Sequence, residues 1–114
     1  AKDVGGLKVL TATLPDADGD KLRKTGDFLR DKNATVVAVL SAVNDGKITF
    51  LAVCGKDAVS RGVKAGDLVR SVAAICGGKG GGKPDSAMGG GVDLLKLDDA
   101  LATVDDFVAQ TLGL

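Results

Sequence analysis

Two stretches of the chain are almost continuously apolar and β-branched, and both predict buried strands. They cover residues 34–42 and 47–54. Continuous apolar runs of this length are typical of strands that are buried on both faces. Asn44-Asp45-Gly46 between them is a hairpin signal, because Asp-Gly tolerates the positive φ angles of a tight turn. We therefore expect these two strands to pair antiparallel.

The first third of the chain predicts one strand and one helix. Residues 7–14 mix β-branched and apolar positions, which favours a strand, and Pro15 and Asp16 would end it. Asp18 can then cap a helix over residues 19–30, because its carboxylate can accept hydrogen bonds from the first free N–H groups. The side chains expected to face inward from this helix are Leu22, Thr25, Phe28 and Leu29.

Two later segments repeat apolar residues at helical spacing, over residues 64–76 and 100–112. The first would end at the pair Gly77 and Gly78, since glycine commonly follows a helix C-terminus. The second would be capped by Asp98 or Asp99, with an apolar stripe formed by Leu101, Val104, Phe107, Val108 and Leu112. Residues 55–62 are expected to form a connection, in which Asp57 or Ser60 could cap a short turn. Residues 92–95 are expected to be either an extended edge piece or a lead-in to the last helix.

The order of these elements predicts an α/β (α+β) domain, with a small mixed β-sheet and helices packed on it. Residues 7–114 would form one globular domain, and residues 1–6 a linker remnant. Apolar residues make up 45% of the chain, which is enough for a core. Its aromatic residues are only Phe28, Phe50 and Phe107, so the core must be built mainly from Val, Leu, Ile and Ala.

Residues 77–91 hold eight glycines in two clusters, separated by Pro84-Asp85-Ser86 and its neighbours. Glycine lets another backbone come close, and Lys79 and Lys83 lie inside the run. Bare amides beside ammonium groups suit a phosphate-bearing partner. The helix before the run presents its C-terminal end, so such a grip must come from the loop itself. The alternative is a flexible linker between strands. We expect a glycine-rich loop at the rim of the sheet.

Composition excludes several classes of function. The formal net charge is zero, so total charge predicts no attraction to nucleic acid or membrane, although every basic residue except Lys96 precedes Pro84. The absence of histidine excludes Ser–His and Cys–His nucleophile pairs and most zinc sites. No run reaches the roughly 20 apolar residues that cross a bilayer. Cys54 and Cys76 end apolar runs and predict buried free thiols in a reducing, cytoplasmic compartment.

Two segments carry a resemblance to a known family. Arg61–Val69 contains the start of the predicted helix that ends before the Gly77–Gly90 run. Together these two segments resemble the C-terminal (C-Ala) domain of alanyl-tRNA synthetases, a domain of the DHH-associated superfamily. The resemblance covers most of the chain and is weakest before Pro15. It implies an accessory module that binds the outer corner of tRNA and contributes to dimerisation. The implied partners are alanine-specific tRNA, the rest of the synthetase chain and a second copy.

The same superfamily contains phosphoesterases, which the chain departs from. They follow a related glycine motif with a histidine, where this chain has Val92 after Gly91. Their metal-binding aspartate and histidine motifs are missing as well. We therefore expect no catalytic residue, metal or cofactor in this domain. Three hypotheses remain: an RNA-binding accessory domain, a dimerising module whose glycines pack between subunits, and an enzyme acting alone, which no acid–base pair or metal constellation supports.

The candidate nucleic-acid contacts combine the cations of both segments with the glycine run. With all three phenylalanines expected in the core, phosphate contacts should dominate over base stacking, and affinity should fall with salt. Asp85 is either a ribose ligand or a residue that orders its own turn. The full set is Arg61, Lys64, Arg70, Lys79, Gly80, Gly81, Gly82, Lys83, Asp85, Ser86, Gly89 and Gly90.

Some charged and apolar residues have simpler interpretations. Arg61 and Arg70 would contact phosphate or pair with the nearby Asp57 and Asp67. Met88, between the glycine clusters, is expected to fill space in the core. The basic cluster on the first helix is interpreted as a solvated face, and it consists of Lys21, Arg23 and Lys24.

Overall fold

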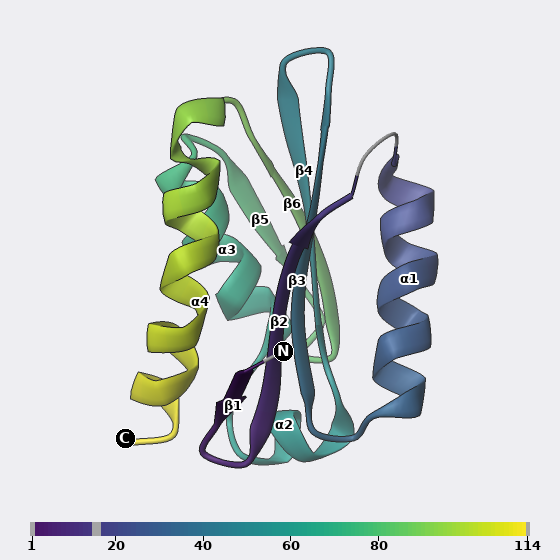
Figure 1. Ribbon diagram of the computed structural model, residues 1–114, viewed down its shortest axis with the longest axis vertical. Coiled ribbons are helices and arrows are strands. Elements are labelled where there is room, and N and C mark those ends of the chain that lie inside the picture. The colour runs from purple at the N-terminus through teal and green to yellow at the C-terminus, as the bar shows by residue number, and fades with distance from the viewer. Residues whose placement is uncertain (1, 15–16, 114) are drawn as a thin grey trace.

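The computed structural model describes residues 2–14 and 17–113. Within these ranges it has a six-stranded sheet with helices on both faces (Figure 1). The strands are β1 (Lys2–Val4), β2 (Leu7–Thr13), β3 (Val36–Asn44), β4 (Lys47–Cys54), β5 (Lys79–Gly82) and β6 (Ser86–Gly91). The helices are α1 (Gly19–Lys32), α2 (Lys56–Ser60), α3 (Ala65–Ile75) and α4 (Leu97–Thr111), with a 3₁₀ helix, η1 (Leu94–Lys96), before α4.

The sheet is mixed, as the sequence predicts. Its order is β1-β2-β3-β4-β6-β5, and β2 pairs parallel to β3 while the other neighbours are antiparallel. The parallel pair is joined by α1, since parallel neighbours need a crossover connection. Pro15 and Asp16, predicted to end a strand, lie outside the described residues. The predicted α/β class with a small mixed sheet is confirmed.

Local signals place the central elements where the sequence predicts them. Asn44 pairs with Lys47 across a turn in which Asp45 and Gly46 have φ angles of 52° and 74°. Such positive angles at both central positions match the twist of the two strands. At α1, the Asp18 carboxylate accepts from the Lys21 N–H at 2.9 Å, which confirms the predicted cap.

The end of α3 is also as predicted. Gly77 has a φ of 73°, and the Gly78 N–H donates to the Ala73 carbonyl at 2.8 Å. This geometry satisfies a carbonyl that the last turn of the helix leaves free. The glycine pair therefore closes α3 and directs the chain into β5.

The helices form two layers around the sheet. Figure 1 shows α1 on one face, with α3 and α4 on the other. Both sides of the sheet are buried, which explains the continuous apolar runs of β3 and β4. Gly26 lets α1 lie close to the sheet, because a Cβ there would be 2.5 Å from Leu51 Cδ2. The predicted apolar stripe of α4 is confirmed, with Val104 and Val108 buried and Leu101, Phe107 and Leu112 packed beside them.

Phe28 is a correction to the sequence analysis. It was expected to face inward, yet 58% of it is exposed. The buried positions of α1 are Leu22 and Gly26, with Leu29 packed beside them. These residues are spaced four and three apart and define one stripe. Phe28 precedes Leu29 by one residue, which rotates it about 100° off that stripe, since a helical turn takes 3.6 residues.

Two helix caps also differ from the sequence expectation. α4 begins at Leu97, and η1 leads directly into it, so Asp98 and Asp99 lie in its first turn rather than at the cap. Residues 92–95 therefore act as the lead-in, one of the two alternatives. Asp57 and Ser60 likewise lie inside α2, whose N-cap is Gly55. Neither of these helices has a side-chain hydrogen bond at its N-cap.

The N-terminal segment was not predicted as structure. Residues 1–6 were assigned to a linker remnant, yet Lys2–Val4 form β1 and pair with Val9, Lys8 and Leu7 of β2. Three residues with one apolar side chain give no usable pattern, and the edge of β2 supplies their partners. Cys54 and Cys76 are free and buried, as predicted. Among the described residues, no helix is both long enough and apolar enough to span a membrane.

Candidate nucleic-acid interface

The glycine run forms a β-hairpin at the edge of the sheet rather than the predicted loop. β5 pairs with β6, and β6 pairs with β4 over the range Ile48–Val53. Glycine is intrinsically unfavourable in strands. Here strand pairing and the packing of α3 override that preference. The predicted position at the rim of the sheet is correct, while the predicted loop conformation is wrong.

One face of this hairpin is packed against the protein itself. A Cβ on Gly80 would lie 3.0 Å from Gly89 Cα and 3.2 Å from Val69 Cγ1 of α3. A Cβ on Gly89 would lie 2.9 Å from Gly80 Cα. Gly78 and Gly91 are similarly tight, against the Gly90 carbonyl and against Cys76. These glycines let a helix and two strands approach closely, so they are not exposed amides that grip a ligand.

The other face of the hairpin borders a hollow of about 580 Å³ beside α1. From α1 it is lined by Arg23, Asp27 and Arg30, which are spaced four and three residues apart and so share one helix face. From the hairpin it is lined by Gly81, Gly82, Lys83, Asp85, Ser86, Ala87 and Met88. The hollow therefore brings together cationic side chains from two segments far apart in the sequence.

The cations of this hollow are not equivalent. Arg30 has carboxylates nearby on three sides, with its guanidinium nitrogens 3.3 Å from Asp27, 3.7 Å from Asp31 and 3.5 Å from Asp85. The Arg23 Nη2 atom donates to the Met88 sulfur at 3.6 Å, and no ion pair joins Arg23 to another of the described residues. Lys83 is exposed, and no ion pair holds it in the part of the chain that the structure describes. Arg23 and Lys83 are thus the cations available to an anionic partner.

Five of the predicted contact residues lie at this hollow, and they come from the turn end of the hairpin: Gly81, Gly82, Lys83, Asp85 and Ser86. Gly80, Gly89 and Gly90 lie in the paired strands, with the first two turned toward α3. Lys79 begins β5, four extended residues or roughly 13 Å from Lys83. The two lysines therefore do not form a single grip, contrary to the sequence expectation.

The remaining predicted cations lie elsewhere. Arg61 ends α2, and Lys64 is the N-cap of α3. The Arg70 Nη1 atom lies 3.2 Å from the Asp67 carboxylate, so the pairing alternative holds for that arginine. Within the described residues, no ion pair joins Arg61 to Asp57. Met88 packs with the α1-side core, as predicted.

The α1 residues of the hollow were missed by the sequence analysis. The sequence pattern places Arg23 in a solvated basic cluster and gives no sign of a role for Asp27 or Arg30. Their spacing is visible in the sequence, since residues 23, 27 and 30 lie on one helix face. What the sequence could not show is that the glycine hairpin becomes a neighbour of that face.

Cys54 lies directly behind the β5–β6 turn. Its N–H donates to the Asp85 carbonyl at 3.0 Å, and its side chain is fully buried. Burial, with a smaller contribution from the Asp85 carboxylate, raises the pKa of the Cys54 thiol to about 12. The thiol is therefore neutral at physiological pH and poorly suited to nucleophilic chemistry.

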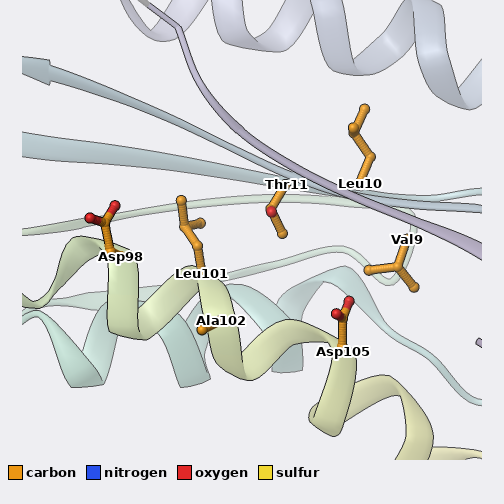
Figure 2. A pocket seen from close by; sticks show the side chains of 7 residues that line it. All are labelled: Val9, Leu10, Thr11, Asp98, Leu101, Ala102 and Asp105. Atoms are coloured by element: carbon orange, nitrogen blue, oxygen red, sulfur yellow. The ribbon is translucent and has the colours of Figure 1, made fainter. Parts of the chain in front are cut away.

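A second hollow, of about 510 Å³, lies on the opposite face of the sheet. Figure 2 shows Asp98 and Asp105 projecting from α4 on the side where Val9 and Thr11 of β2 lie. α4 holds four acidic residues and no basic one, whereas α1 holds five basic and three acidic. The zero net charge thus conceals a separation, with the basic helix and the acidic helix on opposite faces. A polyanion would be repelled by the α4 face.

Comparison with known proteins gives the family. The DHHA1 domain family matches residues 6–110. Alanine–tRNA ligase of Methylobacillus flagellatus is 50% identical over 112 residues, which cover 98% of this chain and 13% of that protein. The ligase of Paracidovorax citrulli is 52% identical over 110 residues, or 96% of this chain and 12% of that protein. The chain thus spans about an eighth of the length of these relatives.

A solved structure agrees with this assignment. The C-Ala domain from Aquifex aeolicus alanyl-tRNA synthetase has a TM-score of 0.87 and 26% sequence identity to this chain. The match covers 95% of this chain and 96% of that domain. The resemblance found in the sequence is confirmed. The chain therefore belongs to the DHHA1 domain family, and within it is similar along nearly its whole length to the C-Ala domains of alanyl-tRNA synthetases.

Proposed function

We propose that this chain is an RNA-binding accessory domain of an alanine–tRNA ligase. It would hold the outer corner of tRNA in the cytoplasm while the catalytic and editing domains of the ligase act on the amino-acid end. The partners would be alanine-specific tRNA and the remainder of the ligase. This assignment is supported by the names of the relatives and by the share of this chain that their similarity covers.

The observation that carries the proposal is the hollow between α1 and the β5–β6 hairpin. It presents Arg23 and Lys83 on the face of the sheet that lies away from the acidic α4. Arginine and lysine contacts to phosphate supply most of the affinity of such interfaces and fix the orientation of the RNA. The domain would act by docking, with these cationic side chains holding phosphates of the RNA in place.

The role of the glycines in this proposal differs from the sequence hypothesis. Gly80 and Gly89 serve the packing of α3, while Gly81 and Gly82 border the hollow. A dimerising module has less support than RNA binding, because the tight glycine contacts are made within one chain. Sedimentation of the purified chain would reveal a stable dimer if one forms.

The test measures tRNA affinity of the chain by fluorescence anisotropy across a salt series. Arg23→Ala and Lys83→Ala should each weaken binding and lower the magnitude of the salt slope by about 1. Lys47→Ala is the matched control, since it removes the same charge at the start of β4, whereas the hollow lies near the other end of that strand. Equal affinities for all three variants and the wild type would contradict the proposal.

A further inference from the structure

The solvent-facing side of α1 carries an aromatic ring between lysines. Phe28 is 58% exposed, and Lys24 and Lys32 lie four residues before and after it. Lys21 lies seven residues before it, two turns along the same face. All three lysines are exposed. These four residues are called the α1 outer stripe.

The core does not account for this ring. Leu22 and Leu29 make the contacts of α1 with its core cluster, and Phe28 belongs to neither cluster among the described residues. Instead, Lys32 Nζ lies 4.8 Å from the centre of the Phe28 ring. A cation over an aromatic face is a favourable contact even at an exposed site. The ring is therefore held in a cationic surface rather than in an apolar one.

Charge indicates what this surface fits. The stripe lies on the same helix as Arg23 and Arg30 but on a different side of it, since two residues of helix rotate Phe28 by about 160° from Arg30. It is therefore a second cationic surface, separate from the hollow. Lys24 and Lys32 each lie four residues from Phe28, which places them about 6 Å on either side of it along the helix axis. A ring flanked by ammonium groups matches a nucleotide strand, in which a base lies between phosphates. Single-stranded segments and loops of RNA bind proteins through such stacking.

We infer that the α1 outer stripe binds an unstacked nucleobase of the RNA, with Phe28 as the stacking platform and its flanking lysines at the neighbouring phosphates. The inference rests on the proposed RNA-binding function and adds a base contact to it. It reverses the expectation that stacking is absent. Phe50 is buried and Phe107 packs against the core, whereas Phe28 is exposed. Lys32 lies over one face of the Phe28 ring, so the base would stack on the opposite face.

The test compares Phe28→Leu, which removes the ring, with Phe28→Tyr, which keeps it. Phe28→Leu should weaken tRNA binding by roughly 5- to 150-fold, the range found for loss of one stacked base. Phe28→Tyr should retain the wild-type affinity within about twofold. The salt slope should stay unchanged in Phe28→Leu, because no phosphate contact is lost. Urea unfolding of both variants verifies that they are folded.

A second ligand separates stacking from a general effect on the helix. A fully paired RNA duplex offers no unstacked base within its length, so Phe28→Leu should bind it like the wild type. Equal loss for duplex and tRNA would overturn the stacking role. Unchanged tRNA affinity in Phe28→Leu, with loss in Arg23→Ala and Lys83→Ala, would reject the inference and leave the proposed function standing. Failure of the wild-type chain to bind tRNA would reject both.

Discussion

Arg30 of α1 and Asp85 of the β5–β6 turn are joined across the rim of the hollow, with Arg30 Nη1 3.5 Å from Asp85 Oδ2. The two residues are separated by 55 positions in the sequence, yet their pair links the helix to the glycine hairpin. Asp85 is 52% exposed, and pairs at that exposure contribute about 0.2–1 kcal/mol to stability. The main consequence of this ion pair is electrostatic, because Asp85 partly neutralises the charge of Arg30 beside the candidate interface.

Asp85→Asn should therefore tighten tRNA binding. The change removes one negative charge from the hollow and frees Arg30, and the gain should be about 1.5- to 5-fold, the affinity equivalent of an exposed ion pair. Asp45→Asn, in the β3–β4 turn, removes the same charge away from the hollow and serves as control. Anisotropy titrations at low salt give the comparison. Weaker binding by Asp85→Asn would instead favour the alternative that Asp85 is a ribose ligand.

Gly89→Ala should lower the free energy of unfolding by about 1–3 kcal/mol, the usual cost of overpacking. Its Cβ would lie 2.9 Å from both Gly80 Cα and the Lys79 carbonyl, and backbone cannot move aside cheaply. Gly81→Ala is the matched control in the partner strand, because its Cβ would meet only Arg70 Nη2, at 3.8 Å. That variant should be as stable as the wild type or slightly more. Urea unfolding curves of the two variants measure the difference, and equal losses would argue against the packing role.

Cys54 should make the stability of the protein fall at alkaline pH. Its pKa is raised from 9.0 to about 12 in the folded state, so its stabilising effect is complete below pH 9 and is lost as the pH rises toward 12. The slope from this thiol is about 1.4 kcal/mol per pH unit within that window. Unfolding free energies of the wild type and Cys54→Ala, measured between pH 8 and 11, should converge as the pH rises.

Cys76→Ala is the control for this pH experiment. Its thiol pKa is also raised, by burial first and by Asp93 second, with Lys96 acting in the opposite sense. This variant keeps the contribution of Cys54, and should therefore lose stability more steeply than Cys54→Ala over the upper part of the window. Parallel curves for the wild type and Cys54→Ala would show that the Cys54 thiol is not the group that titrates.

The predictions from sequence succeed where a signal is local. The Asp18 cap, the Asp45-Gly46 turn and the Gly77 stop of α3 each depend on residues within one or two turns of chain. The β3 and β4 runs are long enough that their burial follows from composition alone. The predicted starts of α2 and α4 are wrong because these helices have no side-chain cap, so no local residue marks their first position.

The candidate site could be predicted only in part. The sequence contains Lys83 and Asp85 beside the glycines, and it contains Arg23 and Arg30 at helical spacing. It does not contain the information that these two sets face each other. That proximity arises because β6 pairs with β4 and extends the sheet, so that the face of the hairpin turned away from α3 lies beside α1.

The sequence by itself determined the class of fold, the central hairpin, the apolar faces of α3 and α4, and the family. Each of these is encoded in local patterns, or in a motif that is read without coordinates. Only the tertiary structure decided that the glycine run is a packed hairpin, that Phe28 faces solvent, and that opposite faces carry opposite charge. The physical reason is that each of these three features depends on contacts between residues far apart in the sequence. Such long-range contacts override the intrinsic preference of a residue for one conformation.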